Sequence, residues 1–252
     1  MLQNQPMVHD AAAQGFDRDA STYQRARPSY HPDVVARFVQ RYGTGAVLEI
    51  GAGTGIFTQQ IVDEGVSVVA VEPVLAMRQR LLDALPTVDV REGTAESLPV
   101  DGAACDTVVV AQSFHWFDWK PALNEIHRVL RHGGHLVTAW NVKDGDTDWF
   151  KAYMEIVDGH AGDTPRHADL RWRAAIDGDR RYELVDDWHV DHPKRMDREG
   201  VVARALSTSF IAALPDDDRA RVATELRRVL ESVAEPLHFP YRAELQAWRT
   251  GH

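Results

Sequence analysis

The stretch VLEIGAGTG at residues 47–55 decides the fold of this 252-residue chain. An apolar run over 46–50 ends in glycines spaced G-x-G-x-G, and apolar residues at helical spacing follow over 54–64. A strand, a glycine turn and a helix in immediate succession form a ligand-binding turn in open α/β sheets, because glycines let a ligand lie against bare backbone. The sequence therefore predicts a ligand at the carboxyl end of this first strand.

Strand and helix signals alternate through the segment that follows this turn. Strands are expected over 66–71, 88–91, 106–111 and 135–140, and helices over 74–85 and 120–131, where Gly133-Gly134 ends the last helix. Such alternation implies right-handed crossovers and a mostly parallel sheet covered on both faces. We therefore predict an α/β, Rossmann-like, doubly wound fold.

The rest of the chain is less regular and divides the predicted molecule into four parts. Residues 1–42 are expected to form a helical lead-in or lid, and 43–141 the ligand-binding core. Residues 142–236 are expected to form helical cap insertions and pocket segments, with a further core strand near 184–192, and 237–252 a final core strand. Within the cap, an irregular helical region is expected over 148–175, and helices over 198–210 and 215–234.

Composition excludes several classes of protein. The net charge of −10 argues against broad binding of nucleic acid, which needs a basic surface. The longest apolar run, about 108–111, is far shorter than the roughly 18 residues of a membrane helix. The N-terminus lacks a signal-peptide pattern, so we expect a cytoplasmic protein that spans no membrane. A single cysteine, Cys105, excludes an internal disulfide and indicates a buried thiol, and no residue cluster has the spacing of a metal site.

Two classes of ligand compete for the glycine turn. A dinucleotide fingerprint would need a third glycine at the position of Ile56. Glu49, two residues before the turn, would repel a pyrophosphate but suits a ligand with an ammonium and a sulfonium group, such as S-adenosylmethionine (SAM). Glu72, which ends the next strand (VVAVEP, 68–73), lies at the distance expected for an acid that binds a ribose diol. The residues favour SAM, and a nicotinamide-dependent oxidoreductase is the alternative.

Four motifs in this order resemble the class I SAM-dependent methyltransferases: EIGAGTG (49–55), VEP (71–73), GTAESLP (93–99) and AQSFHWFD (111–118). The lead-in, with FD at 16–17 and RPSY at 27–30, and FPYR at 239–242 are similar to one small-molecule branch, that of the trans-aconitate-type and ubiquinone/menaquinone-type enzymes. The resemblance implies a methyltransferase that acts on a small-molecule acceptor, and we expect a monomer or homodimer. A SAM-binding protein without catalysis is a further alternative.

The resemblance implies cofactor-binding roles for residues of these motifs: Glu49, Gly51, Ala52, Gly53, Glu72, Pro73, Thr94, Ala95, Glu96 and Gln112. The glycine turn would line the methionine part of SAM, with Glu49 holding the turn or facing the amino group. Glu72 would bind the ribose, and residues 94–96 would edge the adenine. Many relatives have aspartate at the position of Thr94, so the chain departs from the pattern there.

Three segments contain candidate residues for the acceptor side of the site. His115 follows the fourth strand, where the methyl group should point, and its ordinary pKa near 6.5 suits a base; the alternative is that it packs beside Trp116, a wall residue. Tyr23 and Arg27 are four residues apart and would share a helix face. We predict that they form a lid, the alternative being an ordinary surface helix. The acceptor atom implied by resemblance is a carboxylate or hydroxyl oxygen, with carbon as the second choice.

Overall fold

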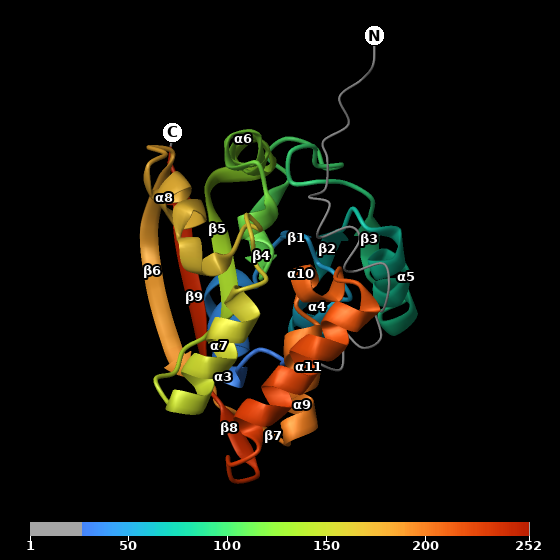
Figure 1. Cartoon of the computed structure of the whole chain (residues 1–252). Helices are drawn as coiled ribbons and strands as arrows, with labels where there is room; N and C mark the ends of the chain where they lie inside the picture. Colours follow the sequence, from blue (N-terminus) through green and yellow to red (C-terminus); the bar gives the residue numbers. More distant parts are fainter. Residues whose placement is uncertain (1–26, 252) are drawn as a thin grey trace.

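The main sheet of the protein has seven strands among residues 27–251, the part of the chain that the computed structural model describes. Their order is β3-β2-β1-β4-β5-β9-β6. The bounds are β1 (Val47–Ile50), β2 (Val68–Val71), β3 (Asp89–Arg91), β4 (Cys105–Ala111), β5 (Leu130–Lys143), β6 (Tyr182–Asp191) and β9 (Tyr241–Thr250). Strands β1 to β5 pair in parallel, and β9 lies antiparallel between β5 and β6 (Figure 1). This confirms the predicted Rossmann-like, mostly parallel sheet.

Helices cover both faces of this sheet. One face carries α3 (Pro32–Tyr42), α4 (Ile56–Asp63) and α5 (Leu75–Ala84), and the other carries α6 (Trp119–Val129), α8 (Arg171–Asp177) and the short helices η1 (Phe114–Trp116) and η2 (His167–Asp169). Phe57 and Leu81 belong to the core of the first face, and Ile126 and Trp172 to that of the second. Burial on both faces explains why the parallel strands are almost continuously apolar.

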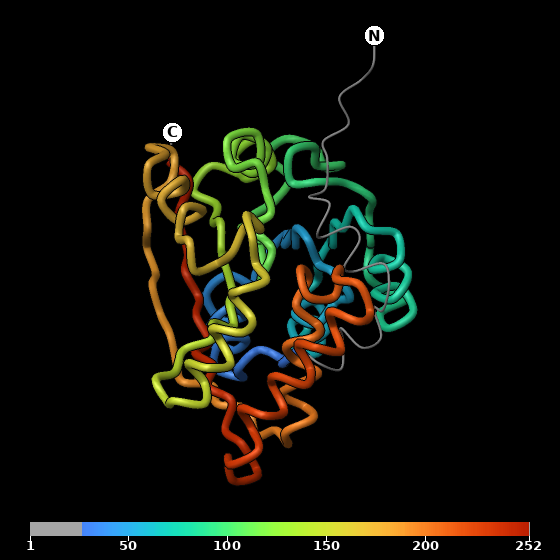
Figure 2. Tube along the Cα trace, viewed as in Figure 1, coloured from blue at the N-terminus to red at the C-terminus, as the bar shows by residue number. Residues whose placement is uncertain are grey.

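A cap with its own hydrophobic core stands beside the sheet. It consists of α7 (Asp148–Asp158), α9 (Arg198–Leu206), α10 (Ser209–Ala212), α11 (Asp216–Leu230) and a separate sheet of β7 (Lys194–Met196) and β8 (Leu237–Phe239). Phe150, Tyr153, Leu226 and Phe239 are buried in its core. Figure 2 shows α7 and α11 side by side although they are far apart in the sequence. Within residues 142–236, β6 joins the main sheet at the place of the core strand expected near 184–192, whereas α8 packs on this sheet instead of on the cap.

Three predicted element boundaries are wrong. The final strand is divided at Pro240, so that β8 pairs with β7 and only β9 enters the main sheet. The helix predicted over 198–210 ends at Leu206, where the Ser207 hydroxyl donates to the Arg204 carbonyl oxygen at 2.8 Å. Gly133-Gly134 does not end α6, which stops at Val129, and lies within β5. In each case, the boundary is set by pairing with a distant strand or by a side-chain contact, and not by the local sequence pattern.

The predicted lead-in is described only from residue 27, so Tyr23 lies outside the described residues. Pro32 opens α3, as its position in a first turn predicts. Cys105 is buried in β4, and burial raises the pKa of its thiol. No helix within 27–251 is long and apolar enough to cross a membrane.

Candidate functional site

A cavity opens where the carboxyl ends of β1 and β4 meet, the point at which the strand order reverses. It encloses about 1210 Å³ of space free of protein atoms, part of it open to solvent. All residues predicted to bind the cofactor lie on its wall, as do Arg27 and Trp116. The four sequence motifs therefore converge on one cavity.

The glycine turn forms the floor of the cavity next to β1. Gly51, Gly53 and Gly55 have φ angles of 69°, 59° and 83°, in the left-handed region that side chains disfavour. A Cβ atom on Gly51 would lie 2.5 Å from the Ser113 Oγ, whereas one on Gly53 would meet only the Met77 sulfur, at 4.0 Å. Gly53 thus leaves open space against the backbone, which a ligand can fill.

Glu72 braces this turn from the end of β2. Its Oε2 accepts a hydrogen bond from the Gly53 N–H, and its Oε1 accepts one from the Val74 N–H, both at 2.9 Å. Burial raises the pKa of Glu72, although these two N–H groups and the Arg78 guanidinium act in the opposite direction. Each carboxylate oxygen keeps a second lone pair for a ligand hydroxyl. Glu72 can therefore hold the turn and accept from a sugar diol at the same time.

Glu49 is a second buried acid in the cavity wall, with a relative exposure of 1%. Its Oε2 accepts from the Thr58 hydroxyl at 2.7 Å. Burial, with a further contribution from Glu72, raises the pKa of Glu49 to about 8, against the lowering effect of Thr58. Two desolvated acids on one wall disfavour a pyrophosphate and favour a ligand with positive charge, which would also lower the pKa of Glu49.

The wall also contains polar atoms that a ligand could satisfy. The buried hydroxyls of Thr54 and Thr94 have no hydrogen-bond partner in the part of the chain that the structure describes. Gln112 has a φ of 64° and its side chain donates to the Asn141 carbonyl oxygen at 3.1 Å, while Glu96 accepts from the Asp118 N–H at 2.9 Å. Buried hydroxyls rarely stay without partners. Together with the open space at the turn and the two acids, they fit a cofactor with the groups of SAM.

His115 lies in η1 beside the cavity but outside its lining. Its ring contacts those of Trp116 and Trp140, with centroids 4.8 and 5.6 Å apart. Burial, with the nearby charges of His167 and Arg27, lowers the pKa of His115 to about 3, so the imidazole is neutral at neutral pH and a weak base. The role of His115 as a base stays a prediction.

Sequence reasoning missed the cap side of the wall, which contains Asn141, Arg204 and Tyr241. Arg204, on α9, is buried, and its Nε donates to the Tyr241 hydroxyl at 2.5 Å. Arg27 approaches the same place, where its Nη2 donates to the Ser207 carbonyl oxygen at 3.4 Å. Tyr241 lies within the FPYR motif, whereas Arg204 belongs to no sequence motif and carries no sequence signal.

Metal chemistry gains no support from the described residues. No group of three or more His, Cys, Asp or Glu within residues 27–251 is arranged to hold a metal ion.

Known proteins resemble this chain in both sequence and fold. A family model described as "Methyltransferase domain" matches residues 48–138. A protein of Mycobacterium tuberculosis named as an uncharacterized methyltransferase is 33% identical over 215 residues, which cover 85% of each chain. This identity extends well beyond the glycine turn and into the cap.

Two solved structures share the fold at low sequence identity. A phosphoethanolamine N-methyltransferase of Haemonchus contortus, solved with SAM, has a TM-score of 0.57 and 15% identity, covering 99% of this chain and 61% of its own. The [4+2]-cyclase SpnF has a TM-score of 0.60 and 17% identity, covering 95% of this chain and 96% of its own. The fold, the glycine turn braced by Glu72 and the extent of the sequence identity lead to one conclusion: the chain belongs to the class I SAM-dependent methyltransferases.

Proposed function

We propose that the protein binds SAM in the cavity at the glycine turn and transfers its methyl group to a small-molecule acceptor. The acceptor atom is a carboxylate or hydroxyl oxygen, with carbon as the second choice. The observation that carries the proposal is the turn itself: Gly53 offers open backbone, and Glu72 holds the same residue through its N–H while facing the cavity. We further propose a cytoplasmic monomer or homodimer, and the charge of −10 supports a small acceptor over nucleic acid.

The chain's own contribution to catalysis is placement. SAM supplies an activated methyl group, so the protein has to hold the acceptor atom in line behind it. The turn and Glu49 fit the methionine end, Glu72 the ribose, and residues 94–96 the adenine. Arg204 of the cap and Tyr241 at the start of β9 line the same cavity and would exclude water from the acceptor. His115 would take a proton only if the acceptor must lose one.

Calorimetry with SAM, its demethylated product S-adenosylhomocysteine (SAH) and NAD tests the proposal. We expect SAM and SAH to bind and NAD not to bind. Glu72→Ala should weaken SAM binding by about tenfold or more, because a charge-assisted hydrogen bond to the ribose is lost. Glu64→Ala removes an exposed acid at the end of α4 and should change nothing. Binding of NAD without SAM would instead identify an oxidoreductase.

Arg27 lines the cavity, and we propose that it contacts the carboxylate of SAM or an acidic acceptor. Arg27→Ala should raise the Michaelis constant for one of the two substrates, whereas the exposed Arg80→Ala should not. Unchanged kinetics in Arg27→Ala would remove this role.

A second candidate is a SAM-binding protein that transfers no methyl group. The likeness to a [4+2]-cyclase favours keeping it, because that fold carries another activity. Formation of SAH from SAM distinguishes the two candidates. A methyltransferase supplied with its acceptor releases SAH, whereas a protein of the second kind leaves SAM unchanged under the same conditions.

A further inference from the structure

A lysine that no sequence motif contains lies on the cavity side of the sheet. Asn141 and Lys143 are two residues apart at the end of β5, so they share one face of the sheet. In the pairing of β5 with β9, Lys143 lies opposite Tyr241. Asn141 and Tyr241 line the cavity, and Lys143 extends from the same face of the sheet but lies behind this wall, outside the cavity lining.

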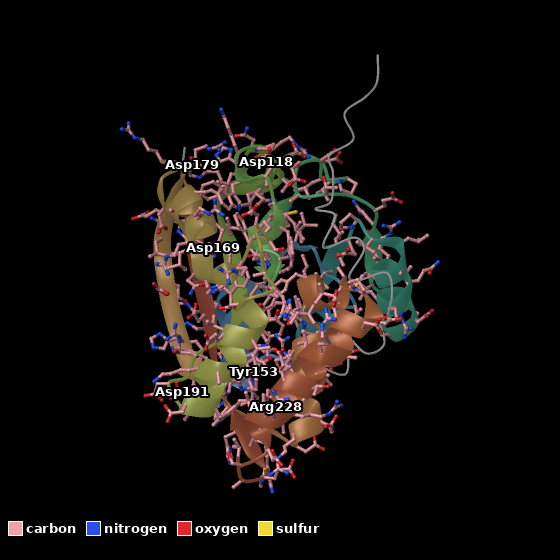
Figure 3. The ribbon with its side chains drawn as sticks, in the orientation of Figure 1. Asp118, Tyr153, Asp169, Asp179, Asp191 and Arg228 are labelled. Carbon is pink, nitrogen blue, oxygen red and sulfur yellow. The ribbon has the colours of Figure 1, made fainter. Side chains whose placement is uncertain are left out.

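The ammonium group of Lys143 is next to a buried hydroxyl on the cap. Its Nζ lies 5.5 Å from the ring centroid of Tyr153, on α7, which Figure 3 labels. Tyr153 is fully buried, and its hydroxyl has no hydrogen-bond partner among residues 27–251. Burial raises the pKa of Tyr153, so the hydroxyl stays protonated and able to donate. A buried donor without an acceptor is costly, which points to a group that is missing from the protein alone.

The charges around Lys143 are mainly positive. Desolvation lowers the pKa of Lys143 well below its ordinary value, and the charges of Arg204, Arg27 and Arg166 lower it further, while Asp158 raises it. Within the part of the chain described here, no salt bridge joins the Lys143 ammonium to an acid. Arg204 adds positive charge and donates to the hydroxyls of Tyr241, Ser207 and Thr208, at 2.5, 3.5 and 3.4 Å. Desolvated cations are costly unless an anion pairs with them.

We propose that Lys143, Tyr153 and Arg204 form an anion subsite that binds a carboxylate of the methyl acceptor. The proposal rests on the proposed function, because it places the acceptor between the glycine turn and the cap. A carboxylate fits this group, since its two oxygens can together accept from the Lys143 amine, the Tyr153 phenol and the Arg204 guanidinium. The acceptor is then a small organic acid that the protein recognises through its negatively charged carboxylate.

Matched pairs of acids and amides test this subsite in the full chain saturated with SAH. We choose hexanoate with hexanamide, benzoate with benzamide, and hexyl phosphate as the phosphate probe, all measured by calorimetry. We expect at least one acid to bind about tenfold more tightly than its amide. Lys143→Met should reduce this preference to less than about twofold. The control Lys151→Met, which removes an exposed lysine on α7, should keep it.

Thermal unfolding separates a binding role from a structural one. Without an acid, Lys143→Met should unfold at the same temperature as the wild type or higher, because it replaces a polar group that burial disfavours with an apolar one. Tyr153→Phe should weaken acid binding severalfold without a loss of stability. Four results would each overturn the subsite: no acid binding, equal affinity for acids and amides, tighter binding of hexyl phosphate than of hexanoate, or a destabilised Lys143→Met that keeps the acid preference. SAH binding in the same samples tests the proposed function separately.

Discussion

Glu49 and Glu72 are two buried acids in the cavity wall that differ in their hydrogen-bond partners. Glu72 is held by two backbone N–H groups, which favour its ionised form. Glu49 accepts a hydrogen bond from the Thr58 hydroxyl, and burial moves its pKa to about 8. Burial raises the pKa of both acids, and a pKa of about 8 keeps Glu49 mostly protonated at neutral pH.

The raised pKa of Glu49 predicts a pH-dependent stability. The folded protein keeps a proton on Glu49 that the unfolded chain releases above pH 4.5, so stability is lost as the pH rises from 4.5 to about 8. Relative to Glu49→Gln, the free energy of unfolding should fall by about 1.4 kcal/mol for each pH unit in this window. Urea denaturation at several pH values measures it. Parallel curves for the two proteins would contradict the prediction, and exposed Glu64→Gln should give parallel curves.

Gly53 offers a test of the turn with a matched control. Gly53 and Gly65 both have positive φ, 59° and 85°, but only Gly53 lies in the cavity wall. A methyl group at either position adds backbone strain of about 1 kcal/mol. Gly53→Ala should also weaken SAM binding by about tenfold or more, because its methyl enters the ligand space. We expect Gly65→Ala to bind SAM normally, and equal SAM affinities in the two variants would exclude the proposed pose.

At the scale of elements, one buried acid fastens α3 to the far edge of the sheet. Asp186, on β6, accepts from the Arg37 Nε at 2.9 Å and from the Tyr42 hydroxyl at 3.0 Å. Burial raises the pKa of Asp186, but these bonds and the charges of Arg37 and Arg41 outweigh it and lower the pKa overall. The contact matters for the site because the chain entering α3 carries Arg27 to the cavity.

Asp186→Ala should lower the free energy of unfolding by about 3 kcal/mol, because it leaves buried partners without an acceptor. The neighbouring Asp187 pairs with Arg173 at an exposed position, and Asp187→Ala should cost less than about 1 kcal/mol. Urea denaturation at pH 7 compares the two. Similar losses in both variants would show that burial does not distinguish these ion pairs.

At the scale of the molecule, the last strand completes both faces of the core. β9 pairs with β5 on one side and β6 on the other, and its Leu245 and Trp248 are fully buried in the cores of opposite faces. Without it, β5 and β6 would each have an unpaired edge. The fold therefore depends on β9, which follows β5 and β6 in the chain and lies between them in the sheet.

A chain that ends at Pro240 should fail to unfold cooperatively, since it lacks β9 and its core contacts. Near-ultraviolet circular dichroism and thermal unfolding measure this. Arg249→Ala changes an exposed position of the same strand and should keep the native transition. A cooperative transition in the shortened chain would show that the remaining strands fold without their closing partner.

The sequence by itself determined the order of strands and helices through residue 141, and the location of the glycine turn with its acids. These features are local: a strand, a turn and a helix start occupy adjacent residues, and their chemistry can be read within a few positions. All predicted cofactor residues accordingly line one cavity.

Only the tertiary structure decided the cap and the acceptor side. The break at Pro240, the insertion of β9 between β5 and β6, and the meeting of Lys143, Tyr153 and Arg204 join segments far apart in the chain. No local pattern encodes such a meeting, because a lysine at a strand end and an arginine in a helix are ordinary in sequence. These side chains form a candidate binding site only when folding brings them together and removes water from them.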